Sequence, residues 1–278
     1  MMYVGSYDAP VRDLASYALR LQELVHLGFH SVGLAISWDE HPRDLSAEDR
    51  QAVADLVREH ELELRFHPDL ANVARASVQH NRELLACAAD ELEPIVAWAV
   101  ELGVVSLCCD SLRQQLDETI DVFSLLVDMT RGTALQLGVE NSQRGIINSP
   151  ERLNEVVDRV GDPRMGVLLD VGHVNTTVTQ QWNDCPSPQD FVTGLRVPIW
   201  DTHLHTNGGV TDDHLPVSNP AGTLDLGQVL AGLDQVGYAG PLNLECSRKN
   251  CPGSLRDMET AMLADRQLLE GIVAQVVR

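Results

Sequence analysis

The sequence predicts an α/β fold, a single (β/α)8 TIM barrel that spans residues 1–278. Short runs rich in β-branched residues alternate with amphipathic stretches along the chain, a pattern typical of parallel α/β folds. Eight such runs occur, and no Pro/Gly/Ser-rich linker or low-complexity tract divides them. A doubly wound sheet is the main alternative, but no predicted strand is followed by GxGxxG, its usual dinucleotide-binding signature.

The predicted elements follow one another in regular order. The eight strands are expected at residues 3–5, 31–36, 62–67, 104–109, 135–141, 165–170, 198–205 and 242–246. Amphipathic helices are expected at residues 13–28, 46–60, 81–103, 149–161 and 225–237, with a last helix at 254–277 that closes the outer ring. Several of these helices open with Ser or Asp and are followed by Gly, which are the residues preferred at the two helix caps.

Charge and cysteine content restrict the function. The chain has 41 acidic and 20 basic residues, a formal charge of −21, and Lys249 is its only lysine. Nucleic acid is therefore not an expected partner, because phosphate contacts need clustered Lys and Arg. The six cysteines form no CxxC pair, which favours a reduced, cytoplasmic location. We expect neither export nor a membrane span, since no signal-peptide pattern and no apolar run of sufficient length occurs.

Polar residues end most of the predicted strands. In a barrel of this kind the carboxyl ends of the strands carry the active site, so these side chains should meet at one mouth. They are His67, Cys109, Asp110, Glu140, Asn141, Asp170, His173, His203, His205 and Glu245. Any one of them alone is more ordinary as a hydrogen-bonded structural residue.

Four of these residues together indicate a metal site. The spacing from Glu140 to Asp170 is 30 residues and from Asp170 to His203 is 33, about one β/α repeat each. Glu245 follows after 42 more residues. Three carboxylates and an imidazole facing one another would repel strongly without a cation. We therefore expect one divalent metal ion, and these oxygen and nitrogen ligands suit Mn²⁺, Mg²⁺, Co²⁺ or Zn²⁺.

The same motifs resemble a known family. The segments VENS, LLDVGHVN, HLHTN followed by DDHLP, and NLEC are together similar to the xylose isomerase-like TIM-barrel superfamily. This group includes sugar phosphate isomerases and epimerases, inosose dehydratases and metal-dependent AP endonucleases. The resemblance implies that Glu140, Asp170, His203 and Glu245 are the metal ligands, although His205 is an alternative to His203.

The resemblance also implies roles for the neighbouring residues. We expect His67, His173, His205 and Asn141 to contact the substrate, with a purely structural role for His67 left open. Asp212 and His214 match a pair that holds an extra metal in the nuclease branch, or they order a loop. Trp38 or Trp200 could add an apolar wall, although core or rim packing is the more ordinary role of a tryptophan.

Some positions depart from the family patterns. Thr206 stands where an acidic residue would follow the strand-seven histidine, and Cys109 and Asp110 stand where the nuclease branch has a histidine. Ile146 and Gly208–Gly209 replace residues of the ketohexose 3-epimerase pocket. A complete three-metal cluster and the details of that sugar pocket therefore do not carry over.

The resemblance and the strand-end residues lead to one expected reaction. We expect metal-dependent isomerisation or epimerisation of a sugar or sugar phosphate through an enediolate next to a carbonyl, with Glu140 and Glu245 transferring the proton. A metal-dependent dehydratase of the inosose or dehydroshikimate type would use the same ligands. An AP endonuclease is disfavoured by the charge, and a non-catalytic barrel would retain the carboxylates without use. The expected partner is a small sugar or polyol, and the resemblance suggests a homo-oligomer.

Overall fold

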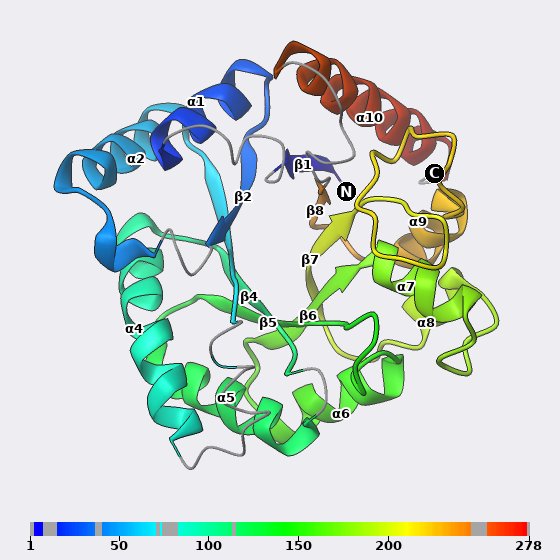
Figure 1. Cartoon of the computed structure of the whole chain (residues 1–278), viewed down its shortest axis with the longest axis horizontal. Coiled ribbons are helices and arrows are strands. Elements are labelled where there is room, and N and C mark those ends of the chain that lie inside the picture. The colour runs from blue at the N-terminus through cyan, green and yellow to red at the C-terminus, as the bar shows by residue number, and fades with distance from the viewer. Residues whose placement is uncertain are drawn as a thin grey trace.

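The structure, a computed structural model, describes residues 3–7, 16–36, 41–70, 73, 83–112, 115–245 and 255–276. In this part of the chain eight strands form one sheet in the order β1-β8-β7-β6-β5-β4-β3-β2, and all paired strands are parallel. Strands β1 and β2, at the two ends of this order, also lie in contact. The sheet therefore closes into a ring with the helices outside it (Figure 1). The predicted (β/α)8 TIM barrel is confirmed.

The strands lie close to their predicted positions. They are β1 (Tyr3–Tyr7), β2 (Ser31–Ile36), β3 (Glu63–Pro68), β4 (Ser106–Asp110), β5 (Gln136–Glu140), β6 (Met165–Asp170), β7 (Ile199–Leu204) and β8 (Pro241–Leu244). The boundaries differ from the prediction by one or two residues, because hydrogen bonding to a neighbouring strand and not the apolar pattern decides where a strand ends. Division into one domain over residues 1–278 stays a prediction.

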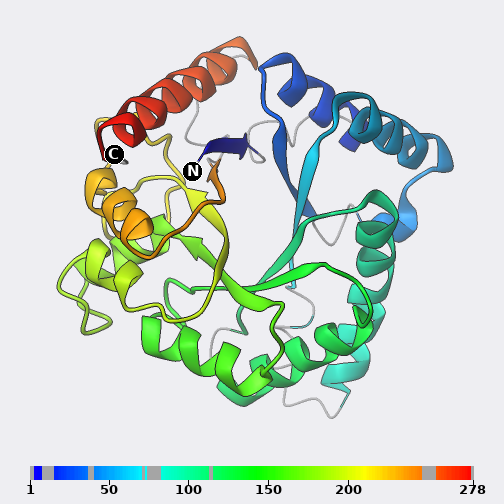
Figure 2. The same ribbon diagram turned by 180° about the vertical axis from the view of Figure 1, so that it is seen from behind.

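The helices cover the outside of the barrel (Figures 1 and 2). They are α1 (Tyr17–His26), η2 (Pro42–Asp44), α2 (Ala47–His60), α4 (Leu84–Leu102), α5 (Leu116–Met129), α6 (Pro150–Val160), α7 (Val171–Thr179), α8 (Pro188–Thr193), α9 (Leu226–Gln235) and α10 (Leu255–Val276). The predicted segments did not include α5, α7 or α8. Among these, α7 starts directly after the strand residue Asp170, so its first turn lies at the barrel mouth.

Helix α6 shows how local sequence sets these elements. The Ser149 side chain accepts a hydrogen bond from the Arg152 amide, and Pro150 occupies the first helical position. Gly161 ends the helix with φ of 71°, a left-handed conformation that glycine adopts without strain. Leu153, Val156 and Val157 lie on the buried face between these caps, which fastens α6 to the barrel.

Trp200 lies away from the mouth, which agrees with the packing role and not with an apolar wall of the site. Trp200 lines a cavity of about 730 Å³ together with Glu63 and Gln136, which are the first residues of β3 and β5. This cavity is at the amino-terminal end of the strands, opposite the mouth. The Trp200 indole donates to the Arg164 carbonyl at 2.8 Å. Trp200 lies at an irregularity between β6 and β7, where Val167 pairs with Ile199 and the next residue, Leu168, pairs with Asp201. Trp200 is therefore a packing residue, and Trp38 lies outside the described residues.

No helix among the described residues is long and apolar enough to cross a membrane.

Candidate metal centre

The carboxyl ends of the strands bring the predicted site residues together. Glu140 ends β5, Asp170 ends β6, His203 is the penultimate residue of β7, and Glu245 directly follows β8. Asp170 pairs in register with His203, so the two neighbouring strands present them at the same height. Glu140, Asp170 and His203 are all buried, as expected for side chains that point into the mouth and not into solvent.

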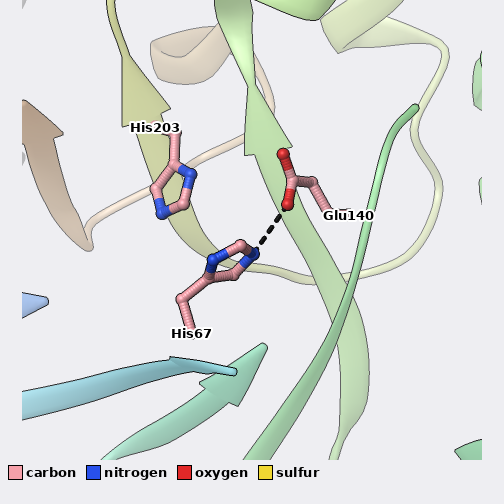
Figure 3. A group of neighbouring side chains, drawn as sticks. All are labelled: His67, Glu140 and His203. Carbon is pink, nitrogen blue, oxygen red and sulfur yellow. Dashed lines mark hydrogen bonds and ion pairs between the residues drawn. The ribbon is translucent and has the colours of Figure 1, made fainter. Parts of the chain in front are cut away.

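His67 and His203 face Glu140 across this mouth (Figure 3). His67 Nε2 donates to Glu140 Oε2 at 2.7 Å, and the His67 and His203 rings lie 4.8 Å apart in an edge-to-face arrangement. Burial alone would lower the pKa of His67, but the Glu140 carboxylate raises it above its ordinary value. Burial raises the pKa of Glu140, and Asp110, its register partner on β4, raises it further against the opposing effect of His67.

Asp170 connects β6 to the first turn of α7. Its side chain caps the helix, with Oδ1 accepting from the His173 amide at 2.7 Å. His205 Nε2 lies 3.1 Å from Asp170 Oδ1 and 3.2 Å from Oδ2. Burial would raise the pKa of Asp170, but His173 and His205 lower it below its ordinary value. Asp170 is therefore held in its ionised form, as a metal ligand must be.

Gly172 makes room for this arrangement. A Cβ on Gly172 would overlap the His205 ring, including the Nε2 atom that faces Asp170. The glycine in the sequence LLDVGHVN therefore allows the fully buried His205, which directly follows β7, to reach the β6 carboxylate.

Glu245 meets two histidines from β7 and the loop that follows it. Its Oε2 atom lies 3.0 Å from His203 Nδ1 and 3.5 Å from His214 Nδ1. Burial would raise the pKa of Glu245, but the two imidazoles lower it well below its ordinary value. Although both nitrogens are close, no described residue donates to the buried Oε2 with hydrogen-bond geometry. A buried carboxylate oxygen without a donor is the kind of atom that a cation satisfies.

Asp212 contacts two histidines, His173 and His214, at the mouth. His173 Nε2 and His214 Nε2 each lie 3.1 Å from Asp212 Oδ2. Burial opposes ionisation of Asp212, but hydrogen bonds from His173 and His214 lower its pKa far below its ordinary value. Burial likewise opposes protonation of His214, yet Glu245 and Asp212 raise its pKa to about 10. The pair predicted from DDHLP thus belongs to the same electrostatic cluster as Asp170 and Glu245.

The loop that carries His214 is held rigidly. Thr206 and Leu215 form an isolated antiparallel bridge across it, and the His214 ring stacks on the His205 ring at 4.1 Å with an interplanar angle of 5°. His214 itself has φ of 46°, a left-handed conformation that costs energy for a residue with a side chain. The contacts of its ring offset this cost and keep its nitrogens turned toward Asp212 and Glu245.

Five triads among the described residues bring three potential ligand atoms within 4.8 Å of one another. They are His67/Glu140/His203, His173/Asp212/His214, His205/His214/Glu245, Glu140/Asp170/His173 and Asp170/His203/Glu245. The last triad contains three of the four predicted ligands, and the fourth, Glu140, shares a triad with Asp170. His205 lies in a different triad with Glu245, so its choice against His203 as the ligand stays open. The donor set, carboxylates and imidazoles without thiolate, fits a divalent ion.

The family follows from a match that covers most of the chain. The family model described as Xylose isomerase-like TIM barrel matches residues 21–270. The chain belongs to this family. An uncharacterized protein from Methanocaldococcus jannaschii is 26% identical over 229 residues, which cover 77% of this chain and 74% of the relative.

Solved structures share the whole xylose isomerase-like barrel. A D-tagatose 3-epimerase-like protein superposes with a TM-score of 0.77 at 19% identity, covering 99% of this chain and 98% of that protein. D-allulose 3-epimerase from Methylomonas sp., in complex with D-allulose, superposes with a TM-score of 0.69 at 16% identity, covering 89% of this chain and 85% of the enzyme. At these identities the comparison establishes a common fold.

The barrel interior also contains residues that the sequence did not single out. The residues two positions before His67, His203 and Glu245 form a buried polar layer below the site: Arg65, Asp201 and Asn243. Asn243 donates to Asp201, and Arg65 donates to Ser106 at 3.2 Å. The period of two along a strand was the available signal, because residues i and i−2 point to the same side of the barrel wall. Arg248 and Lys249 lie outside the described residues.

Proposed function

We propose that this chain is a divalent-metal-dependent sugar isomerase or epimerase that moves a proton next to a carbonyl group. The observation that supports the proposal is the cluster of carboxylates and imidazoles at the carboxyl ends of β5 to β8, whose ligand atoms lie within 4.8 Å of one another in each triad. Glu140, Asp170, His203 and Glu245 would hold the ion, with His205 as the alternative to His203. When bound, the ion would supply Lewis acidity that favours the developing enediolate.

Glu140 and Glu245 would move the proton. Glu140 and Glu245 lie on either side of Asp170, in triads that both contain it. In the proposed reaction, one of these carboxylates removes the proton from the carbon beside the carbonyl, and the other returns a proton to the same or the adjacent carbon. His67 positions Glu140 through its 2.7 Å hydrogen bond. His173 and His205 would orient substrate hydroxyls. The substrate class is a sugar, because this chemistry needs a carbonyl with an adjacent C–H and hydroxyl.

Solvent exchange tests this function directly. The protein, purified without chelator and supplied with Mn²⁺, Mg²⁺, Co²⁺ or Zn²⁺, is incubated in D₂O with D-allulose, D-tagatose and a panel of other ketoses and aldoses. We expect deuterium at the carbon next to the carbonyl, together with the isomer or epimer, both detected by NMR. Absence of exchange and of product with every sugar and every ion would refute the proposal.

Substitution of Glu140 and Glu245 tests whether these two carboxylates transfer the proton. Glu140→Gln and Glu245→Gln should each lower turnover by about 10²-fold or more, because each removes a carboxylate that transfers the proton. Glu155→Gln is the matched control, since Glu155 pairs with Arg152 on the surface of α6. Equal turnover in Glu140→Gln, Glu245→Gln and the control would remove both residues from the mechanism.

A dehydratase of the inosose or dehydroshikimate type stays the alternative, because elimination of a β-hydroxyl would use the same ligands. The same NMR experiment with inosose and 3-dehydroshikimate separates the two reactions. A product that has lost water would favour the lyase, whereas an isomer of equal mass favours the isomerase.

The Asp212 triad supports a second ion as part of the proposal. His173 and His214 both lie 3.1 Å from one Asp212 oxygen, and this triad is separate from Asp170/His203/Glu245. Elemental analysis gives the metal content per chain. One ion supports the single-metal enzyme, and two or three ions would implicate Asp212, His214 and His173 as further ligands.

A further inference from the structure

Asn141 is the residue after Glu140, and its side chain reaches across to the neighbouring strand. Its Nδ2 donates to the Asp170 carbonyl at 2.9 Å, and its Oδ1 accepts from the Asp170 amide at 2.8 Å. One carboxamide thus satisfies both backbone groups of a single residue. Asn141 is 1% exposed, so water does not compete for these bonds.

This pairing replaces a missing rung of the sheet. The backbone ladder between β5 and β6 ends with Glu140 opposite Leu168, two residues before Asp170. The backbone of Asp170 bends there from strand to helix, with φ of −84° and ψ of 112°. A carboxamide can direct one N–H and its carbonyl oxygen to the same side, as the N–H and C=O of a strand residue do, so Asn141 continues the ladder beyond its last backbone pair.

The hydrogen bonds from Asn141 to the backbone of Asp170 also orient the Asp170 carboxylate. With its backbone held on both sides, Asp170 can cap α7 through Oδ1 and still face His205 with both oxygens. The backbone carbonyl of Asn141 adds a second constraint, because it accepts from His173 Nδ1 at 2.8 Å. This bond orients the His173 ring so that its Nε2 lies 3.1 Å from Asp212 Oδ2.

We propose that Asn141 is a positioning residue that fixes Asp170 and His173 for metal binding, and not a group that contacts the substrate as the sequence suggested. This inference rests on the proposed function, since Asp170 is a proposed ligand of the ion and His173 belongs to the triad with Asp212 and His214 that would hold a second one. Residues in the second coordination sphere typically change metal affinity by about 10- to 100-fold when they are replaced.

The chain contains a matched control for this role. Asn154 on α6 makes the same pair of backbone contacts away from the mouth: its Nδ2 donates to the Gly194 carbonyl at 3.0 Å and its Oδ1 accepts from the Arg196 amide at 2.9 Å. It is also buried, at 3% exposure. Substitution of Asn154 therefore removes an equivalent set of hydrogen bonds without touching the candidate metal centre.

The test is calorimetric titration of Mn²⁺ into chelator-stripped full-length protein. Leucine has nearly the size of asparagine but no polar group. We expect Asn141→Leu to bind Mn²⁺ about 10- to 100-fold more weakly than the wild type. Asn154→Leu should bind within about two-fold of the wild type, because its lost bonds do not hold a ligand residue. Thermal unfolding of the metal-free proteins should show comparable losses for the two leucine variants.

Two outcomes would overturn the inference. Either Asn141→Leu binds Mn²⁺ as well as the wild type does, or Asn154→Leu weakens binding as much as Asn141→Leu. If circular dichroism shows that Asn141→Leu does not fold, Asn141→Asp takes its place, because it keeps the acceptor for the Asp170 amide and loses the donor to the carbonyl. Failure of the wild-type protein to bind any divalent ion would instead refute the proposed metal function, and this inference with it.

Discussion

Gly172→Ala is a small substitution with a large expected effect. Gly172 lies in the first turn of α7, and an added Cβ would overlap the ring of His205. That ring is fully buried, and it stacks on His214 at 4.1 Å. It can make way for a methyl group only by giving up its contacts with the Asp170 carboxylate, which are 3.1 and 3.2 Å long.

The magnitude follows from three contributions to the free energy of unfolding. Overpacking a filled interior costs about 1–3 kcal/mol. Loss of the hydrogen bonding between His205 and ionised Asp170 costs about 1.5 kcal/mol or more. Alanine returns up to about 1 kcal/mol through its better helix propensity. The net loss is about 1.5–3.5 kcal/mol, which lowers the midpoint of thermal unfolding by roughly 3–14 °C for a chain of this size.

The assay combines unfolding with metal titration. Gly172→Ala should unfold earlier in urea and on heating, and it should bind Mn²⁺ more weakly, because Asp170 loses the side chain that orients it. Gly271→Ala is the control: Gly271 lies in α10, and a Cβ there meets nothing within 4 Å, so stability should rise by about 0.5–1 kcal/mol. The reasoning is refuted if Gly172→Ala unfolds with the wild type and binds Mn²⁺ with the same affinity.

Three further predictions concern metal removal, pH and packing. Mn²⁺ at about 100 times its Kd should raise the free energy of unfolding of chelator-treated protein by about 2.7 kcal/mol. An unfolding midpoint that stays unchanged with Mn²⁺, Mg²⁺, Co²⁺ and Zn²⁺ alike would contradict a metal centre. A hydrogen bond from Arg164 holds the pKa of Asp162 below its ordinary value, so this carboxylate stabilises the folded state above about pH 4 and stops doing so as the pH falls through its lowered pKa. Asp162→Asn should therefore lose about 1–2 kcal/mol at pH 7 and little at pH 3 in urea titrations, and a deficit that stays constant with pH would disprove the assignment. Trp200→Phe removes the indole donor to the Arg164 carbonyl at the far end of the barrel; it should cost about 1 kcal/mol in urea unfolding and leave Mn²⁺ affinity unchanged, and weaker binding would place Trp200 in the site after all.

Much of the fold and of the rim could be predicted from the sequence because both depend on local patterns. Alternation of β-rich runs with amphipathic helices identifies eight repeating units. Once the repeats are in phase, the residue that ends each strand is defined, and Glu140, Asp170 and His203 then share one mouth. The glycines and serines at helix ends act within a few residues of their own position, as Ser149 and Gly161 do in α6.

The partners of each side chain at the mouth were decided only by the tertiary structure. The sequence HLHTN contains two histidines, and only the closed barrel places His205 against Asp170 and His203 against Glu245. The sequence places Asn141 at the rim, but its hydrogen bonds to the Asp170 backbone depend on where the ladder between β5 and β6 stops. Trp200 packs near the amino-terminal ends of the strands, beside an irregularity in the register of β6 and β7 that only the structure reveals.

The difference between what the sequence predicts and what only the tertiary structure decides has a physical cause. Hydrophobic periodicity and capping are interactions over a few residues, so the sequence determined the class of fold and the set of rim residues on its own. Hydrogen bonds between residues such as His67 and Glu140, which are 73 positions apart, depend on barrel closure, strand register and loop conformation together. No pattern along the chain encodes these separately, and the electrostatics of the candidate metal centre therefore belong to the tertiary structure.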